Sequence, residues 1–241
     1  MAIKAVTFDF WRTLFRENER DERTQIRIDA FIEATGAPVD EVMPAFEKTW
    51  GEFLRHHIEE QRTLRPQDAV RLTAEALDIT LEDDVFTELT EIFGTAILRF
   101  PPIPIDDALE AVQHSAAHVP VGIISDSGIS PGTSLRKLLL NHGFSKCLSN
   151  MVFSDELGVA KPQAAMYHEA ARGLGVHVTE LLHIGDLQPT DIIGAQNVGA
   201  SAALFAGDNA RFYDKTTAEH SFRSWREFID RFTELELDSA T

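Results

Sequence analysis

Residues 3–14 read IKAVTFDFWRTL, a short apolar run that stops at an aspartate. A run this short and this apolar is typical of a strand buried on both faces of a parallel sheet, so we predict a strand over residues 3–8. Asp9 then stands at the carboxyl end of that strand, where open α/β sheets bind their ligands. Asp9 is therefore the first candidate for chemistry in the chain.

The part of the chain beyond residue 99 alternates between two hydrophobic periods. The predicted strands cover residues 121–125, 151–153, 181–184 and 202–205. The predicted helices cover residues 106–118, 134–141, 163–174 and 191–198, and a last helix begins at the capping-box pair Ser224 and Glu227. Strands that alternate with helices predict right-handed crossovers and a doubly wound, mostly parallel α/β sheet.

Residues 21–98 have a different pattern. Their apolar residues recur at helical spacing, glycine and proline are sparse, and no strand signal occurs. The proline-rich residues 100–104 end this pattern, because proline cannot continue a helix. We predict a core formed by residues 1–15 and 99–241, and several consecutive helices inserted as residues 16–98.

Composition limits the class of partner. The net charge of −17 repels nucleic acids and anionic membrane surfaces, so we expect a small-molecule substrate and neither of those partners. The single cysteine, Cys147, excludes an intrachain disulfide, and no apolar run resembles a signal peptide or approaches the ~20 residues of a membrane span. These features predict a cytoplasmic protein. The acidic residues within 234–238 are expected on a solvated surface.

Polar residues stand where the later strands end. Ser125 and Asp126 end one predicted strand, and Asp186 ends another. Asp191 follows Asp186 by five positions, and Lys161 precedes a predicted helix. Because parallel strands end at the same edge of a sheet, we expect these side chains to meet there together with the aspartate of the first strand.

Such a cluster has a coherent chemistry. Asp9, Asp186 and Asp191 repel one another at close range, and this repulsion demands protons or a cation. Mg²⁺ accepts a few carboxylates, keeps several waters and binds phosphate oxygens. Lys161 can hold Asp9 as the carboxylate, and Ser125 can donate to phosphoryl oxygens. We therefore predict Asp9, Lys161 and Ser125 as catalytic residues, with Asp9 as a nucleophile that forms an aspartyl-phosphate.

Four segments, in order, resemble the motifs of the haloacid dehalogenase-like hydrolase superfamily. They are residues 9–14 (DFWRTL), 123–126 (IISD), 161–162 (KP) and 185–191 (GDLQPTD). The resemblance extends to about residue 205. It implies a Rossmann-like core, a helical cap inserted between the first and second motifs, and in most members a Mg²⁺-dependent phosphatase activity on a phosphorylated metabolite. It also implies that the backbone carbonyl of Trp11 joins the metal ligands.

One position departs from the phosphatase pattern. Phosphatases of the superfamily carry a second aspartate two residues after the nucleophile, which protonates the leaving group and then activates water; here Trp11 stands there, followed by Arg12 instead of the usual glycine. Loss of general acid–base catalysis costs ~10²–10⁴-fold in rate. Trp11, Arg12, Ser125 and Asp126 are the predicted substrate contacts, although Arg12 also suits a solvated surface. Asp126 either replaces the missing acid or only orients its loop.

Three functions stay open at this point. The first is a Mg²⁺-dependent phosphatase, and the second is another chemistry of the same superfamily, dehalogenation or carbon–phosphorus cleavage. The pair Asp186 and Asp191 argues against dehalogenation, which needs no Mg²⁺. The third is a catalytically weakened protein that binds a ligand or partner, and Trp11 keeps this reading open. The substrate and the oligomeric state are not readable from the residues.

Overall fold

The predicted first strand is β1 (Ala5–Phe8), and it lies in the middle of a parallel sheet. It pairs with β4 (Val121–Ser125) on one side and with β6 (Leu181–Gly185) on the other. The computed structural model describes residues 2–235, so positions 236–238 of the predicted acidic surface stretch lie outside the described residues. Within residues 2–235 this sheet has six strands in the order β5-β4-β1-β6-β7-β8, and every pair is parallel. The other three strands are β5 (Asn150–Phe153), β7 (Ser201–Phe205) and β8 (His220–Phe222).

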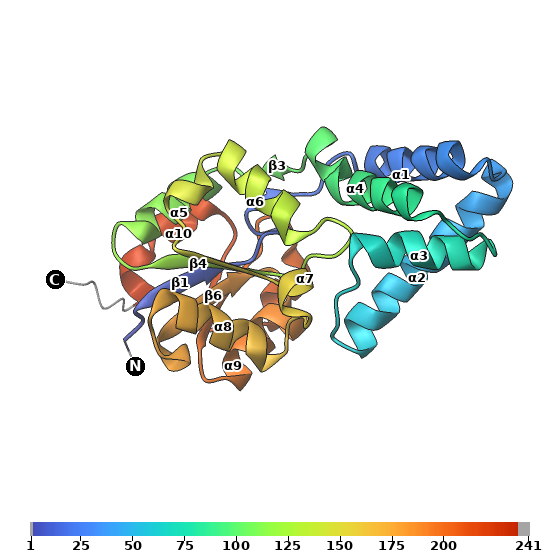
Figure 1. The fold of residues 1–241 in the computed structure, drawn as a ribbon. Coiled ribbons are helices and arrows are strands. Elements are labelled where there is room, and N and C mark those ends of the chain that lie inside the picture. Colours follow the sequence, from blue (N-terminus) through green and yellow to red (C-terminus); the bar gives the residue numbers. More distant parts are fainter. Residues whose placement is uncertain (1, 236–241) are drawn as a thin grey trace.

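Helices cover both faces of this sheet (Figure 1). One face packs against α5 (Ala108–Ala116), α6 (Gly132–Asn141) and α10 (Trp225–Asp230). The other face packs against α8 (Ala164–Leu174) and α9 (Ile193–Asn197), and α7 (Ser154–Leu157) follows β5 directly. Successive side chains of β1 point to opposite faces of the sheet, as in any strand. Phe8 belongs to the first cluster and Ala5 to the second. The doubly wound α/β fold predicted from the sequence is confirmed.

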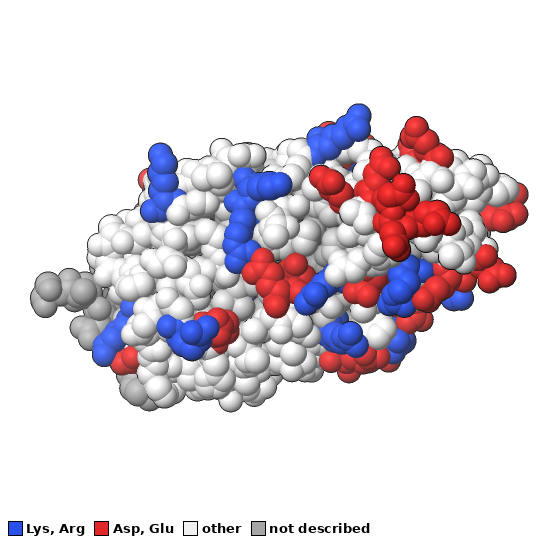
Figure 2. All heavy atoms as spheres, viewed as in Figure 1, with Lys and Arg blue, Asp and Glu red and all other residues white. Residues whose placement is uncertain are grey.

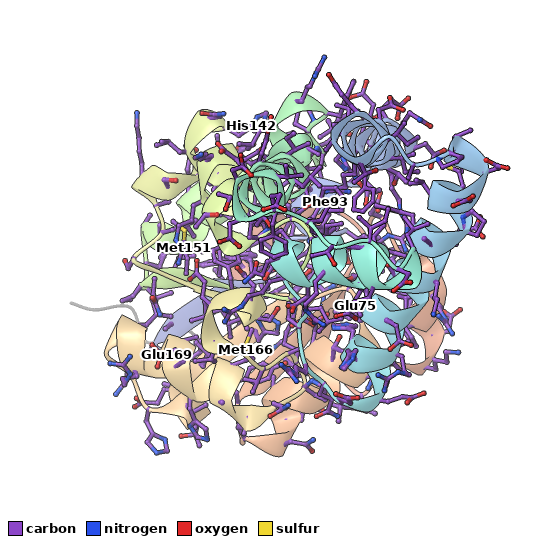
Figure 3. All side chains as sticks on the ribbon, turned by 45° about the vertical axis from the view of Figure 1, so that its right-hand side comes forward. Glu75, Phe93, His142, Met151, Met166 and Glu169 are labelled. Atoms are coloured by element: carbon purple, nitrogen blue, oxygen red, sulfur yellow. The ribbon has the colours of Figure 1, made fainter. Side chains whose placement is uncertain are left out.

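Four helices lie beside the sheet and form a core of their own. They are α1 (Arg20–Thr35), α2 (Val39–Glu59), α3 (Pro66–Ala76) and α4 (Asp83–Arg99). Phe31 and Phe93 are fully buried between them, and Figure 3 shows Phe93 pointing into this interior. This is the inserted helical cap of the predicted fold. The exact domain limits, residues 15/16 and 98/99, stay a prediction.

The chain leaves and re-enters the sheet domain through a small antiparallel pair of strands that the sequence did not predict. Strand β2 (Phe15–Arg16) pairs with β3 (Ile103–Pro104), so the proline-rich residues 100–104 are fixed to the outgoing segment. Figure 2 shows acidic side chains gathered on the viewed face of the helical cap. Among the helices of residues 2–235, none combines the length and the apolar character that a membrane crossing requires.

Candidate active site

Asp9 continues the central strand by one residue. Its backbone N–H donates to the carbonyl of Ile184 (2.8 Å), which extends the pairing of β1 with β6 up to the sheet edge. The side chain of Asp9 is 4% exposed. Because β4 and β6 flank β1, the segments that carry Asp126 and Asp186 leave the sheet on either side of Asp9. The parallel sheet thus brings the predicted strand-end residues to one edge.

Lys161 binds two of these carboxylates at once. Its Nζ lies 2.6 Å from Asp9 Oδ1 and 2.6 Å from Asp191 Oδ1, and it also donates to the carbonyl of Ile124 (3.2 Å). Burial alone lowers the pKa of Lys161, but Asp191 and Asp9 outweigh it and hold the pKa well above its ordinary value. Lys161 is therefore a permanent cation at the sheet edge.

One ammonium does not neutralise three carboxylates. Burial, together with the charges of Asp191 and Asp186, raises the pKa of Asp9 to about 8 against the opposing effect of Lys161. Burial and Asp191 raise the pKa of Asp186 to about 7. Asp191 shows the opposite shift: its pKa is lowered, because Lys161 and His183 outweigh its burial. Asp9 and Asp186 are therefore the two carboxylates whose negative charge Lys161 does not fully compensate.

Asp191 is held in place by protein donors on both oxygens. Oδ1 accepts from Lys161 and lies 3.2 Å from His183 Nε2, while Oδ2 accepts from the N–H of Leu187 (2.9 Å). His183 Nδ1 in turn lies 3.0 Å from Thr7 Oγ1, so this histidine is a fully hydrogen-bonded core residue that positions Asp191. A Cβ on Gly185 would lie 2.3 Å from Asp191 Cγ, which explains the glycine before Asp186.

Asp9 and Asp186 suit a magnesium ion better than Asp191 does. Asp186 Oδ2 accepts from Asn209 Nδ2 (2.7 Å), whereas Asp186 Oδ1 and Asp9 Oδ2 accept no hydrogen bond within residues 2–235. Mg²⁺ is usually held by one or two carboxylates, with waters and substrate phosphate completing the octahedron. The donors present fit that pattern, and both Asp191, acting through a water, and the Trp11 carbonyl stay predicted ligands. In the described part of the chain, no group of three or more His, Cys, Asp or Glu side chains is arranged to hold a metal ion by itself.

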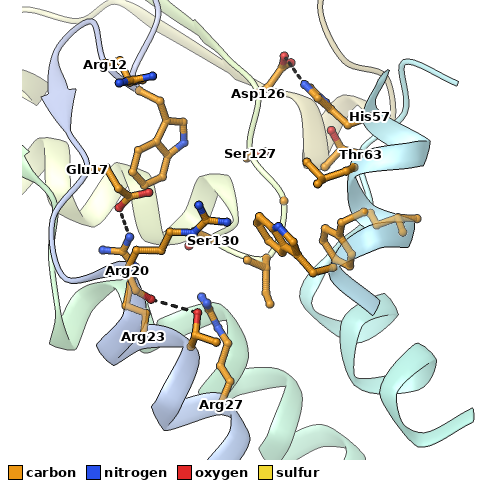
Figure 4. A pocket seen from close by; sticks show the side chains of 18 of the residues that line it. Arg12, Glu17, Arg20, Arg23, Arg27, His57, Thr63, Asp126, Ser127 and Ser130 are labelled. Atoms are coloured by element: carbon orange, nitrogen blue, oxygen red, sulfur yellow. Dashed lines mark hydrogen bonds and ion pairs between the residues drawn. The ribbon is translucent and has the colours of Figure 1, made fainter. Parts of the chain in front are cut away.

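The loop after β4 presents Asp126 to the site rather than Ser125. Ser125 is fully buried, and its hydroxyl donates to the carbonyl of Asp126 (3.2 Å). Its predicted contact with phosphoryl oxygens needs that hydroxyl to turn and stays a prediction. Asp126 Oδ1 accepts from the backbone N–H of Lys161 (2.9 Å), and Oδ2 lies 3.8 Å from His57 Nε2 of the cap (Figure 4). Burial raises the pKa of Asp126 against the effect of Lys161 and His57.

Trp11 and Arg12 lie at the mouth of the site. Both line the cavity, and Trp11 packs edge-on against the ring of Phe10. Arg12 has a φ of 57°, a conformation that costs a residue with a side chain about 1–2 kcal/mol and explains the glycine usual at this position. Its exposed guanidinium donates to Asp208 (3.2 Å). Arg12 is thus both partly solvated and adjacent to the cavity.

A cavity of about 670 Å³ lies between the sheet edge and the helical cap. Asp9, Lys161 and Asp186 form its floor on the sheet side. The apolar part of its cap wall includes Ile28, Met43, Phe46, Trp50, Phe53 and Leu54. Three arginines of α1 and His57 of α2 also line the cavity, and none of them was predicted as a site residue. The one feature of the sequence that could have indicated these cavity residues was the helical spacing of the three arginines.

Known proteins resemble this chain in both sequence and fold. A family model described as a haloacid dehalogenase-like hydrolase matches residues 3–199. The chain is 35% identical over 77 residues to a glyceraldehyde 3-phosphate phosphatase of Methanopyrus kandleri, covering 32% of this chain and 31% of that protein. It is 28% identical over 134 residues to (S)-2-haloacid dehalogenase 2 of Pseudomonas sp. strain CBS-3, covering 55% and 54%. The matched segments thus span about a third of the first relative (31%) and about half of the second (54%).

A solved structure shares the fold over nearly the whole chain. It is that of the HAD-hydrolase YfnB from Bacillus subtilis bound to magnesium, with a TM-score of 0.65 and 15% identity over 95% of this chain and 98% of that one. At this identity the likeness speaks for the fold alone. The family model covers most of the chain, including all four motif segments. The chain therefore belongs to the haloacid dehalogenase-like hydrolases.

Proposed function

We propose that this hydrolase is a Mg²⁺-dependent phosphatase that acts on a small phosphorylated molecule through an aspartyl-phosphate at Asp9. The observation that carries the proposal is the setting of Asp9. One of its oxygens is fixed by Lys161 at 2.6 Å, the other has no protein donor within residues 2–235, and the side chain opens onto the cavity. A carboxylate oriented in this way can attack an electrophile in the cavity.

The first step forms a bond between Asp9 Oδ2 and phosphorus and breaks the bond between phosphorus and the leaving oxygen. Asp9 has to be ionised for this attack, and a pKa of about 8 means that Lys161 alone does not ensure it near neutral pH. A Mg²⁺ ion held by Asp186 beside Asp9 would supply the missing positive charge and would stabilise charge on the phosphoryl group. Lys161 fixes the angle of attack by holding the other oxygen of Asp9.

The second step is attack of water on the aspartyl-phosphate, which releases phosphate and regenerates Asp9. Both steps require a proton transfer, and Trp11 cannot provide one. Asp126 is an alternative that the cavity offers, since burial raises its pKa and its Oδ2 lies 3.8 Å from His57 Nε2. Substrates whose leaving groups need little protonation, such as aryl and acyl phosphates, are therefore favoured.

The acidic pair supports a phosphatase over a dehalogenase. Both activities occur among the relatives, so similarity alone does not choose between them. An ionised, buried Asp186 repels an anionic haloacid unless a cation is present, whereas the same carboxylate helps to hold the ion that a phosphatase uses. The cytoplasmic location and the lack of a nucleic-acid or membrane partner stay predictions from composition.

A parallel panel of product assays tests the proposal. We expect phosphate release from p-nitrophenyl phosphate and acetyl phosphate with Mg²⁺, none with EDTA, and none from Asp9→Asn. Halide release from 2-chloropropionate and phosphate release from phosphonoacetaldehyde are measured beside them. Metal-independent halide release, or carbon–phosphorus cleavage without ester hydrolysis, would overturn the phosphatase assignment. No product from any substrate, with tight ligand binding, would favour the weakened binding protein.

A further inference from the structure

Helix α1 turns a row of arginines towards the cavity. Arg20, Arg23 and Arg27 are separated by three and four positions, so they share one helix face, and all three line the cavity. The chain carries a net charge of −17, and acidic side chains gather on the viewed outer face of the cap (Figure 2). The viewed face of the cap is therefore acidic, whereas α1 turns basic side chains towards the cavity.

Arg23 is occupied by the protein itself. Its Nη1 donates to the carbonyls of Asn18 (2.6 Å) and Phe100 (2.9 Å), and its Nη2 pairs with Glu17. These contacts tie the start of α1 to the end of α4. Arg23 has little capacity left for a ligand.

Arg27 is buried, but only part of its guanidinium group is hydrogen-bonded. It is 5% exposed, and its Nε donates to the carbonyl of Phe93 (3.0 Å). Its Nη2 is fully buried and has no hydrogen-bond partner in the described residues. Burial and the neighbouring Arg23 lower the pKa of Arg27 to about 9, so it stays cationic at neutral pH. A buried cationic donor without an acceptor is costly, and an anionic ligand removes that cost.

Arg20 points into the same space. Figure 4 shows Arg20 and Arg27 extending from α1 into the gap opposite α2. The guanidinium carbon of Arg20 lies 4.8 Å from the ring centroid of Trp50, and Trp50 stacks on Phe53. An aromatic and apolar wall thus runs beside the two arginines. Acidic residues of the cap, Glu17, Asp21 and Glu47, also line the cavity, and all three are exposed.

We propose that Arg27, assisted by Arg20, binds a second anionic group of the substrate at the cap end of the cavity. The proposal rests on the proposed function for the reacting end, where Asp9 attacks a phosphate. It specifies the substrate class as a molecule with two anionic ends, a phosphate monoester and either a carboxylate or a second phosphate, joined by a body that lies along Trp50 and Phe53. Planar guanidinium groups bind either oxyanion through paired N–H donors.

Non-hydrolysable ligands of graded length provide the test. Binding of ω-phosphonoalkanoates, α,ω-bisphosphonates and plain alkylphosphonates is measured by calorimetry with Mg²⁺ present. At one chain length we expect the second anionic group to raise the affinity about 10- to 100-fold over the methyl-ended ligand. Whichever group gives the larger gain, carboxylate or phosphonate, identifies the second anion.

Variants then locate the effect. Arg27→Met should lose the gain in affinity that the second anionic group provides, and it should keep the affinity for alkylphosphonates. Arg71→Met is the matched control, because Arg71 is an exposed arginine of α3 that pairs with Glu75 and lies outside the cavity lining, and it should keep the gain. If Arg27→Met does not fold, Arg27→Lys replaces it in the test. The lysine side chain is shorter, so this variant should bind the dianionic ligands more weakly and the alkylphosphonates equally well.

The two levels of the proposal fail in different ways. The anion site is overturned if the wild type shows no gain at any length, or if a folded Arg27→Met keeps it. A gain that depends on Arg27, in a protein that releases no phosphate from any ester, would leave the anion site standing and remove the phosphatase chemistry. Phosphate release from esters, in a protein whose affinity does not rise with a second anionic group, would keep the phosphatase chemistry and remove the anion site.

Discussion

Lys161 and Asp9, 152 positions apart in the chain, are joined by a 2.6 Å ion pair in which both side chains are almost fully buried. The pair exists because the loop before α8 and the end of β1 meet at one sheet edge. Asp191 shares the same ammonium at 2.6 Å. The site therefore combines an orienting cation with carboxylates that need a further cation.

Loss of Lys161 should destabilise the fold as well as stop turnover. Lys161→Met leaves Asp9 and Asp191 buried without their cation, and breaking a buried ion pair in this way costs about 3–5 kcal/mol. Denaturant unfolding without added metal measures the loss. Lys137→Met, at an exposed position of α6, is the control and should change stability little. Equal stability of both variants would contradict the role of Lys161 as the local counter-charge.

The glycine before Asp186 should be intolerant of any side chain. In Gly185→Ala, the new Cβ meets the side chain of Asp191, at 2.3 Å from its Cγ, and overpacking of this kind costs about 1–3 kcal/mol. Gly51→Ala, in α2, meets nothing within 4 Å and should stabilise by about 0.5–1 kcal/mol. Thermal unfolding of the two variants checks the opposite signs. A neutral Gly185→Ala would show that Asp191 is free to move.

Asp186 should contribute more to Mg²⁺ binding than an acidic residue on the surface. It keeps one oxygen free of protein donors, and Asp186→Asn removes the negative charge while preserving the shape. We expect the Mg²⁺ affinity, measured by calorimetry, to fall by about tenfold or more, since even outer-shell changes cost 10- to 100-fold. Asp84→Asn, exposed at the start of α4, is the charge-matched control. Equal affinities in the two variants would refute a magnesium site at Asp186.

Trp11 should make the rate depend steeply on the leaving group. Without a general acid, aryl phosphates with acidic phenols should react much faster than alkyl phosphates, by up to the ~10²–10⁴-fold that such an acid supplies. Trp11→Asp should flatten the dependence. Rates across a series of substituted phenyl phosphates and alkyl phosphates measure both slopes.

A flat dependence in the wild type would mean that another residue donates the proton. Asp126→Asn is then the informative variant, because Asp126 is half-buried, has a raised pKa and lies 3.8 Å from His57 of the cap. Loss of alkyl phosphate turnover in Asp126→Asn, with aryl phosphate turnover kept, would identify Asp126 as the replacement acid.

Five of the six sheet strands in residues 2–235 were predictable because each carries its own hydrophobic period, whereas the three-residue strand β8 (His220–Phe222) was not predicted. The apolar run that ends at Phe8 was enough to predict Asp9 at the sheet edge. The two-residue strands β2 and β3 carry no period, and only their pairing reveals them. The helix expected over 191–198 begins one turn earlier, as a π-turn over Gln188–Ile192 that positions Asp191.

Contacts that depend on tertiary packing were not predictable. The direction of the Ser125 hydroxyl, towards the carbonyl of Asp126, is set by the loop geometry after β4. The contact of His183 with Asp191 also depends on packing, and it could not be named from the sequence. The arginines of α1 show helical spacing, yet which face meets the cavity depends on how α1 packs against α4.

The most direct test of the account is detection of phosphate on Asp9. The enzyme is mixed with acetyl phosphate and Mg²⁺, quenched in acid during turnover, digested and analysed by mass spectrometry. Because Trp11 provides no base for the attacking water, the phosphoenzyme should accumulate, and one phosphoryl group should appear on the peptide that contains Asp9 and vanish in Asp9→Asn. Steady phosphate release with that peptide unmodified, or undiminished release by Asp9→Asn, would contradict the covalent mechanism.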